Sequence, residues 1–365
     1  MLKVLSIVGA RPQFIKEAVI TKAFREKGIQ EVLIHTGQHY DANMSDLFFS
    51  DLQIKKPDYN LGIGSGSHAY QTGTGMMKME EIVLIEKPDV LLVHGDTNAT
   101  IAGALVGAKL KVPVAHVEAG LRQTPKDMPE EINRVVTDHV SRYLFCPTAL
   151  ATNNLKAEGI TAGVFFTGDV MYDLFLSVRN EVNIEETRTR YSVRETEFFF
   201  ATLHRDFNTD HPERLRSILE AFAEIANHCP LILPVHPRTR KAIQSNGFGD
   251  YLLNLNVIDP IPYADTVALL SGAKCVITDS GGVQKEAYFA GTPALVMMED
   301  TGWRELVEMG FNTLVDADKE KIITGALSEK PIGEITPGLF GNGDAGSRIA
   351  GIIAEAVERC SQIKP

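Results

Sequence analysis

The stretch from Val276 to Glu286, Val-Ile-Thr-Asp-Ser-Gly-Gly-Val-Gln-Lys-Glu, combines residue types suited to binding a phosphate beside a sugar. It predicts an apolar strand ending at Asp279, a tight Ser280-Gly281-Gly282 turn, and a helix that starts at once. Glycine lets backbone N–H groups converge on an anion, and the helix N-terminus presents its positive end there. Glu286, one helical turn further on, could accept hydrogen bonds from ribose hydroxyls. An ordinary strand-to-helix turn that needs glycine is the alternative interpretation.

Polar clusters follow the other apolar runs of the chain in the same way. Ligands bind at the carboxyl ends of parallel strands, so these clusters predict a site that mixes cations, histidines and carboxylates. Two simpler interpretations stay open: His94 and His116 could satisfy backbone groups, and Glu130 and Glu131 could be a solvated helix start. The clusters are Gly9-Ala-Arg11 with Lys16, His94-Gly-Asp96, Glu118 to Arg122, His204-Arg205 and His236-Pro-Arg238.

A metal site is not expected. His35 and His39 have the spacing of metal ligands on a helix, but the intervening Thr-Gly indicates a loop. The four cysteines are widely scattered and form no Cys-x-x-Cys pair, which is typical of reduced, mostly buried thiols in a cytoplasmic protein.

Composition bounds the class of protein. The length of 365 residues, with 44% hydrophobic and 23% charged residues, predicts an ordinary soluble globular protein of two domains. A formal net charge of −11 argues against a nucleic acid or an anionic membrane surface as the main partner. Neither a signal sequence nor a membrane helix is expected, because the apolar runs are short.

Short apolar runs alternate with helical patterns along the whole chain, which predicts α/β domains with parallel sheets. We expect two Rossmann-like, doubly wound domains facing a central cleft, spanning residues 1–172 and 173–365. The closing helix, near 345–361, could pack back on the first domain. Met76, Met77 and Met79 are expected to pack in the core. The predicted strands are 2–8, 31–36, 90–94, 112–117, 143–146 and 164–167, then 197–201, 230–235, 257–258, 275–278, 294–298 and 313–315.

Several stretches, in this order, resemble the non-hydrolysing UDP-N-acetylglucosamine 2-epimerases, whose fold is glycosyltransferase-B-like. They are Gly9-Ala-Arg-Pro-Gln-Phe-Ile-Lys16, Thr36-Gly-Gln-His39, His94-Gly-Asp-Thr97, His116-Val-Glu-Ala-Gly-Leu-Arg122, Pro129-Glu-Glu-Ile-Asn-Arg134, Pro234-Val-His236, Thr278 to Glu286, and Gly341-Asn-Gly-Asp344.

The resemblance implies reversible epimerisation at C2 of a UDP-2-acetamido sugar, through anti elimination of UDP, a 2-acetamidoglucal and re-addition of UDP. It implies a homodimer that needs no cofactor. Asp96, Glu118, Glu130 or Glu131 are then the acid/base candidates, with His204 near the reacting sugar. Residues implied to hold the phosphates, sugar or ribose are Arg11, Lys16, Arg134, His236, Ser280, Gly281, Gly282 and Glu286.

Departures from the main family pattern bear on the substrate. Trp303 stands where an arginine is expected, and the loop 60–68 is distinctive, as in a subgroup that acts on UDP-2,3-diacetamido-2,3-dideoxyglucuronate. A 6-carboxylate would want a further cation, for which Arg122, Arg238 and Arg304 are candidates. A hydrolysing epimerase, a retaining UDP-sugar glycosyltransferase and a non-catalytic UDP-sugar sensor remain the rival hypotheses.

Overall fold

A computed structural model describes residues 2–37, 55–193, 196–328 and 333–363 of the chain. The chain divides into two compact units, residues 1–174 with 337–365, and residues 175–336. Residues 337–365 therefore belong by their contacts to the first unit, whereas the predicted second domain runs on to the C-terminus. Within the described residues, the helices are too short or too polar to span a membrane.

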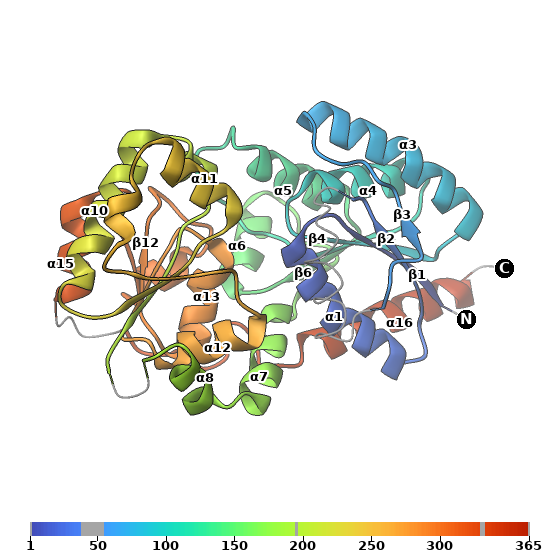
Figure 1. Ribbon diagram of the computed structural model, residues 1–365. Coiled ribbons are helices and arrows are strands. Elements are labelled where there is room, and N and C mark those ends of the chain that lie inside the picture. Colours follow the sequence, from blue (N-terminus) through green and yellow to red (C-terminus); the bar gives the residue numbers. More distant parts are fainter. Residues whose placement is uncertain (1, 38–54, 194–195, 329–332, 364–365) are drawn as a thin grey trace. The chain divides into compact units, whose positions relative to one another are not determined.

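The first unit is built on a seven-stranded parallel sheet in the order β3-β2-β1-β4-β5-β6-β7 (Figure 1). Its strands are β1 (Lys3–Val8), β2 (Gln30–His35), β3 (Tyr59–Asn60), β4 (Val90–His94), β5 (Val114–Val117), β6 (Tyr143–Cys146) and β7 (Val164–Phe166). Its helices are α1 (Arg11–Glu26), α3 (His68–Glu86), α4 (Asn98–Lys109), α5 (Pro129–Val140), α6 (Ala149–Ala157) and α16 (Ala345–Ile363), with α7 (Val170–Glu181) leading into the second unit.

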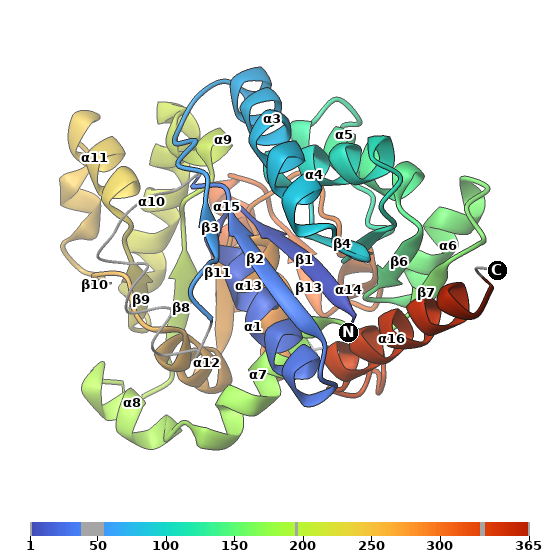
Figure 2. The same cartoon turned by 90° about the vertical axis from the view of Figure 1, so that its right-hand side faces the viewer.

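Both faces of this sheet are covered, which explains its continuous apolar strands. Alternate side chains of β1 and β4 point to opposite faces: Val4 packs with α1 and α16, whereas Leu5 packs with α3 and α4. Figure 2 shows these two pairs of helices on either side of the sheet. Every apolar run that was predicted to be a strand is a strand in the structure. The strand β3 was not predicted, because a strand of two residues is too short to show an apolar pattern.

The last helix lies against the first one, as Figures 1 and 2 both show. Ile349 and Ile353 are fully buried in the same core as Ile20 and Phe24. At its start, the Gly346 N–H donates to Asp173 Oδ2 at 2.9 Å. A Cβ at Gly346 would stand 2.6 Å from Val19 Cγ1, so α16 approaches α1 closely because this residue has no side chain.

The second unit is built on a six-stranded parallel sheet in the order β10-β9-β8-β11-β12-β13. Its strands are β8 (Phe199–Thr202), β9 (Leu231–Pro234), β10 (Asn256–Ile258), β11 (Cys275–Thr278), β12 (Ala294–Val296) and β13 (Asn312–Leu314). Its helices are α8 (Ile184–Arg190), α9 (Asp206–Thr209), α10 (Pro212–Ala226), α11 (Pro237–Ser245), α12 (Tyr263–Gly272), α13 (Gly281–Ala290), α14 (Arg304–Glu308) and α15 (Lys319–Leu327), with a 3₁₀ turn, η1 (Gly249–Leu252).

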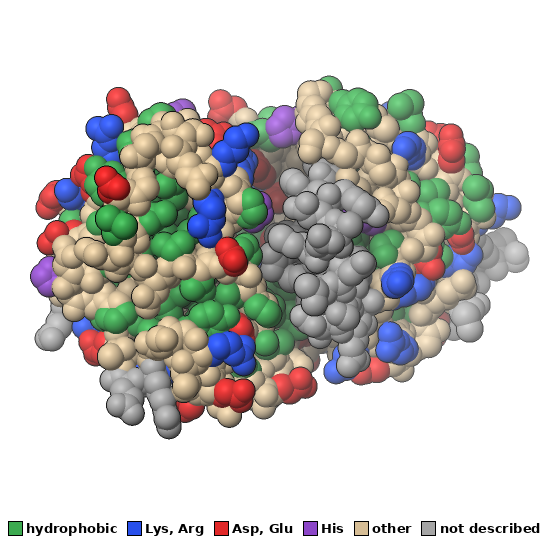
Figure 3. Space-filling model, in the orientation of Figure 1, with side chains coloured by type: hydrophobic (Ala, Val, Ile, Leu, Met, Phe, Trp, Pro, Cys, Tyr) green, Lys and Arg blue, Asp and Glu red, His purple; other side chains and the backbone are tan. Residues whose placement is uncertain are grey.

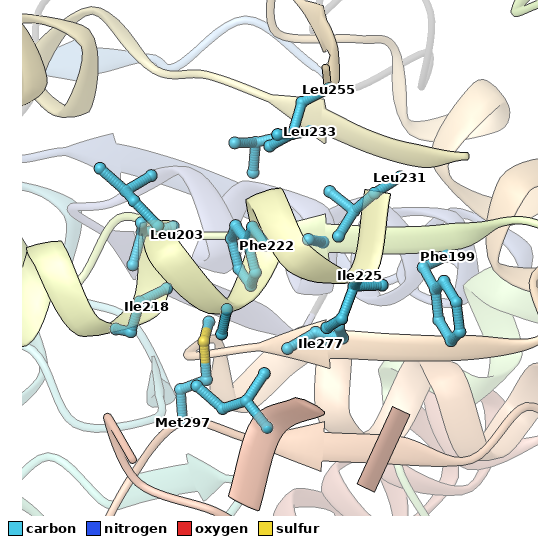
Figure 4. Packing of buried hydrophobic residues seen from close by; sticks show 14 of the residues in the cluster. Phe199, Leu203, Ile218, Phe222, Ile225, Leu231, Leu233, Leu255, Ile277 and Met297 are labelled. Carbon is cyan, nitrogen blue, oxygen red and sulfur yellow. The ribbon is translucent and has the colours of Figure 1, made fainter. Parts of the chain in front are cut away.

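Aromatic and branched side chains fill both faces of this second sheet. Phe222 of α10 packs in one core with Phe199 of β8 and Ile277 of β11 (Figure 4). Phe198 and Phe200, the neighbours of Phe199 along the chain, lie in the core on the other face with α12 and α13. Successive side chains of β8 thus pack on opposite faces, and β8 and β11 lie at the centre of the sheet. The carboxyl ends of these two strands carry the polar residues described below.

Two neighbouring carboxyl groups lie in the first unit: Glu17 of α1 is fully buried and Glu31 of β2 is half-buried. Burial, then the neighbouring Glu17 carboxyl, raises the pKa of Glu31 to about 9. Ser6 Oγ and Thr21 Oγ1 each donate to Glu31 at 2.8 Å. Folding therefore traps a proton that an unfolded glutamate loses near its ordinary pKa of 4.5.

We predict that the first unit becomes less stable as pH rises from 7 to 9. In this window the folded state retains the Glu31 proton and the unfolded state does not, so the free energy of unfolding falls with pH, by at most about 1.4 kcal/mol per pH unit for one proton. Urea unfolding followed by circular dichroism at several pH values measures this slope. Glu31→Gln should flatten it; equal slopes for both proteins would contradict the assignment.

Candidate active site

The first ion pair at the carboxyl edge of the first sheet joins Lys16 of α1 to Glu118, directly after β5. Lys16 Nζ lies 2.8 Å from Glu118 Oε2, and each side chain is only 10% exposed. Glu118 has a left-handed backbone, with φ of 71°, which costs a residue other than glycine about 1 kcal/mol or more. A strained backbone that places a carboxylate against a buried cation is typical of a functional position.

A second cluster joins Arg134 to two carboxylates. Its guanidinium contacts Asp96, which follows β4, and donates to Glu131 Oε2 at 2.9 Å. Glu131 and Arg134 stand three residues apart on α5 and so share one face of that helix. Glu131 is buried and also accepts the Gln123 N–H, whereas Glu130 is half-buried one position away. The sequence left open whether Glu130 or Glu131 is the acid/base candidate. In the structure Glu131 is the one that contacts Arg134.

Gly95 joins the Lys16 pair to the Arg134 cluster. Its φ is 60°, a conformation that glycine adopts without strain. A Cβ there would stand 3.4 Å from Lys16 Nζ and 3.8 Å from Glu118 Oε1. The next residue is Asp96, whose carbonyl accepts a hydrogen bond from Asn133 Nδ2 at 2.8 Å. The carboxyl edge of the first unit thus gathers three carboxylates and two cations around one turn.

Two further predicted features of this unit lie outside the described part of the chain. The side chain of Arg11, at the start of α1, is not described, and His39 falls within residues 38–54. The structure therefore does not test these two assignments. Among the residues that are described, no three His, Cys, Asp or Glu side chains group as metal ligands would.

In the second unit, His204 follows β8 and is oriented by Asp279 at the end of β11. Asp279 is fully buried and accepts the backbone N–H groups of His204 and Arg205, at 3.1 and 2.9 Å. His204 Nδ1 lies 3.3 Å from Asp279 Oδ1, while the His204 side chain is 45% exposed. The sequence marked Asp279 only as the end of a strand; its orienting role depends on the adjacency of β8 and β11.

The Ser280-Gly281-Gly282 segment is the start of α13 itself. Ser280 caps the helix, and its Oγ accepts the Val283 N–H at 3.4 Å. Gly281 and Gly282 are not among the glycines with positive φ, so the alternative interpretation, an ordinary turn that needs glycine, is not supported. A Cβ on Gly282 would meet nothing closer than Ser280 Oγ at 3.8 Å. The glycines therefore leave open space in front of the first N–H groups of the helix, which suits an anion.

Trp303 lies beside this helix start, at the position where the main family pattern has arginine. Its indole Nε1 donates to the Gly281 carbonyl at 2.8 Å, and its ring stands 4.4 Å from Lys285 Nζ. Both side chains are buried, as is Glu286 on the same helix. An aromatic ring and a cation–π contact therefore support the first turn of α13.

The remaining predicted binding residues are His236 and three arginines, and each arginine has a carboxylate partner. His236 is exposed and caps α11, accepting the Arg238 N–H. Arg122 forms a bidentate pair with Glu158 and also contacts Asp138. Arg238 pairs with Asp210 at 2.7 Å and Arg304 with Asp300 at 3.0 Å, each about half exposed. Holding a substrate carboxylate would require any of the three to exchange its present partner.

Comparison with known proteins agrees with this chemistry. Residues 22–354 match the family model for UDP-N-acetylglucosamine 2-epimerase. The chain is 48% identical to the UDP-2,3-diacetamido-2,3-dideoxy-D-glucuronate 2-epimerase of Pseudomonas aeruginosa, covering 97% of this chain and 100% of the relative. It is 46% identical to a UDP-N-acetylglucosamine 2-epimerase homolog of Methanococcus maripaludis, covering 96% and 99%.

Among solved structures, the Methanocaldococcus jannaschii UDP-GlcNAc 2-epimerase, in complex with UDP-GlcNAc and UDP, is similar throughout. It is 42% identical, covers 97% of this chain and 100% of its own, and has a TM-score of 0.89. The prediction of two Rossmann-like domains of the glycosyltransferase-B-like class is therefore confirmed. On its motifs, its fold and the extent of these matches, the chain belongs to the UDP-N-acetylglucosamine 2-epimerase family.

Proposed function

We propose that this enzyme interconverts C2 epimers of a UDP-2-acetamido sugar by reversible elimination and re-addition of UDP. The observation that carries the proposal is the clustering of Asp96, Glu118 and Glu131 against Lys16 and Arg134 in the first unit. Family membership supplies the reaction class, and the clustered carboxylates supply groups able to move a proton.

The chemistry needs both a proton carrier and a leaving group. The hydrogen at C2 is barely acidic, so its removal as a proton must accompany cleavage of the C1–O bond, with UDP taking the bonding electrons. The 2-acetamidoglucal is then reprotonated on the opposite face of C2, and UDP returns to C1. Carboxylates held beside cations suit this cycle, because each ion pair holds the carboxylate in a fixed position.

The second unit is proposed to hold the nucleotide. The open N-terminus of α13 at Gly281 and Gly282 favours a diphosphate, and buried Glu286 one turn along the helix favours the ribose. His204, oriented by Asp279, is proposed to lie near the sugar.

A second substrate has a specific observation in its favour. The relative with 48% identity acts on UDP-2,3-diacetamido-2,3-dideoxy-D-glucuronate, and Trp303 here replaces the arginine of the main pattern. Arg238 and Arg304 are exposed enough to exchange a surface carboxylate for one on a substrate, since such ion pairs are weak. We propose this diacetamido uronate as the alternative substrate for the same chemistry.

Deuterium exchange tests the function directly. Incubating the purified protein with each UDP-sugar in deuterated water should place deuterium at C2 of the true substrate, and NMR shows which epimer accumulates. Release of free sugar would indicate a hydrolysing enzyme, and turnover only with an added acceptor would indicate a glycosyltransferase. Binding without exchange for every sugar tried would contradict the proposal.

Substitutions should separate proton transfer from nucleotide binding. Asp96→Asn, Glu118→Gln and Glu131→Gln should each lower turnover by about 10²-fold or more, because each removes a proposed proton carrier or its charge. Calorimetry should show nearly unchanged UDP affinity. Gly282→Val should weaken UDP binding, because the new side chain has room in the fold but fills the space before the helix N-terminus.

Two control substitutions test whether proton transfer and nucleotide binding depend on different residues. Glu130→Gln changes the neighbour that does not contact Arg134 and should retain most activity. Gly249→Val adds the same side chain elsewhere in the second unit, where a Cβ meets nothing within 4 Å, and should leave UDP affinity unchanged. Equal loss of UDP affinity in Asp96→Asn and Gly282→Val would contradict the proposed roles.

We also propose that the protein is a homodimer formed through α3. Met77 was expected in the core, but it is 64% exposed, because it lies on the face of α3 opposite buried Met79. Tyr70, Met77 and Leu84, each seven residues apart on α3, are exposed and form an apolar stripe. Figure 3 shows hydrophobic side chains at the surface in the region of α3. A stripe of this kind can pair with its own copy about a twofold axis.

Met77→Asp should therefore convert the dimer to a monomer in sedimentation experiments, because a buried, unpaired charge would destabilise the interface. Leu253→Asp is the matched control, since Leu253 is a still more exposed side chain of the second unit. A wild-type monomer, or an unchanged dimer in Met77→Asp, would contradict this interface.

The free thiols of Cys146, Cys229 and Cys275 suit a reducing compartment. We therefore propose that the reaction takes place in the cytoplasm.

A further inference from the structure

His116 is a fully buried histidine at the carboxyl end of β5, next to the proposed acid/base groups. Its ring nitrogens have two different partners. Nε2 lies 2.8 Å from the carbonyl oxygen of Gly95, and Nδ1 lies 2.7 Å from Asp138 Oδ1. The sequence suggested that this histidine could satisfy a backbone group, and the contact with Gly95 is of that kind.

The partner of Nε2 determines where one proton lies. A carbonyl oxygen only accepts hydrogen bonds, so His116 Nε2 must carry a hydrogen. If His116 were neutral, Nδ1 would then be bare and could only accept a hydrogen bond. The protonation state of His116 therefore depends on whether Asp138 can donate.

Asp138 is arranged as an ionised acceptor. The Arg122 guanidinium contacts this buried carboxyl, and an adjacent positive charge favours the ionised form of a carboxyl group. Its second oxygen accepts the Gly120 N–H at 3.1 Å and an Arg122 N–H at 2.8 Å. An ionised carboxylate cannot donate, so Nδ1 must carry a hydrogen as well.

We infer that His116 is a positioning residue, held as a doubly protonated imidazolium that fixes the Gly95 carbonyl and with it the turn carrying Asp96. The inference rests on the proposed function of Asp96. Its chemical content is a buried double hydrogen-bond donor that joins a backbone carbonyl to a carboxylate.

Three polar backbone groups of the Gly95–Asp96 turn make hydrogen bonds. The Gly95 N–H donates to the Val117 carbonyl at 3.0 Å, and the Asp96 carbonyl accepts from Asn133 Nδ2 at 2.8 Å. His116 supplies the contact between these two, at the Gly95 carbonyl. Without it, the peptide that sets the direction of Asp96 could rotate, and its carbonyl would be left unsatisfied in the interior.

The charges around His116 come from several elements. They include Asp138 and Arg122, already described, and Glu118 two residues further along the chain. Lys16 and His116 both act on His94: burial, then Lys16, then His116, lower the pKa of His94 to about 3. His94 contacts Glu17, a carboxyl whose pKa burial raises. His116, in contrast, faces a carboxyl that Arg122 also contacts.

NMR of the intact protein tests the protonation state. With ¹⁵N-labelled histidine, His116 should show one-bond N–H couplings at both ring nitrogens at pH 7 and still at pH 8, where exposed histidines are neutral. The resonance that disappears in His116→Asn assigns the signal. A single protonated ring nitrogen at pH 7 would overturn the inference.

Two substitutions test the positioning role. Glutamine can place its amide N–H where Nε2 lies, whereas asparagine reaches only the position of Nδ1. His116→Asn should therefore lower kcat by about 10²-fold, the cost of a misplaced reacting group, with UDP affinity unchanged, and His116→Gln should restore much of the rate. Equal rates in both variants would overturn the role.

These experiments distinguish failure of the positioning role of His116 from failure of the proposed function. If Asp96→Asn abolishes C2 exchange while His116→Asn exchanges normally, the function stands and the positioning role falls. If Asp96→Asn also exchanges normally, the assignment of Asp96 fails first. Should His116→Asn not fold, the wild-type NMR measurement still decides the charge of His116.

Discussion

A charged side chain removed from water is stable only when an opposite charge or several hydrogen bonds contact it, and this requirement organises the first unit. The helices supply the cations: Lys16 comes from α1 and Arg134 from α5. The loops after β4 and β5 supply the carboxylates Asp96 and Glu118. Packing of the helices on the sheet therefore sets the distances between opposite charges, so the apolar core and the polar edge depend on one another.

The two units meet this requirement by different means. The first uses pairs of full charges, each holding the other in one position. The second surrounds the buried Asp279 side chain with backbone N–H groups of the loop after β8. Full charges suit a step in which protons move, whereas backbone donors suit a diphosphate that gains negative charge as it leaves the sugar. The chemistry of a UDP-sugar epimerase contains both demands.

Much of this arrangement could be predicted from the sequence, because continuous apolar runs identify buried parallel strands and glycine-rich strand ends identify ligand sites. Other features depend on contacts that no local pattern encodes. Glu130 and Glu131 are adjacent residues of the same type, and only their different positions around the axis of α5 distinguish them. Met77 is two residues from Met79 yet on the opposite face of α3. The link from His116 to Asp138 joins residues 22 positions apart through the docking of α5 on the sheet.

The chain contains a single tryptophan, Trp303, and its indole binds the first turn of α13. Indole emission depends on the polarity and charge around the ring, and here Lys285 stands 4.4 Å from the ring centre. All tryptophan fluorescence of this protein therefore originates at the start of the helix proposed to hold the diphosphate. The protein carries its own optical probe of that site, so nucleotide occupancy can be followed in real time without a label.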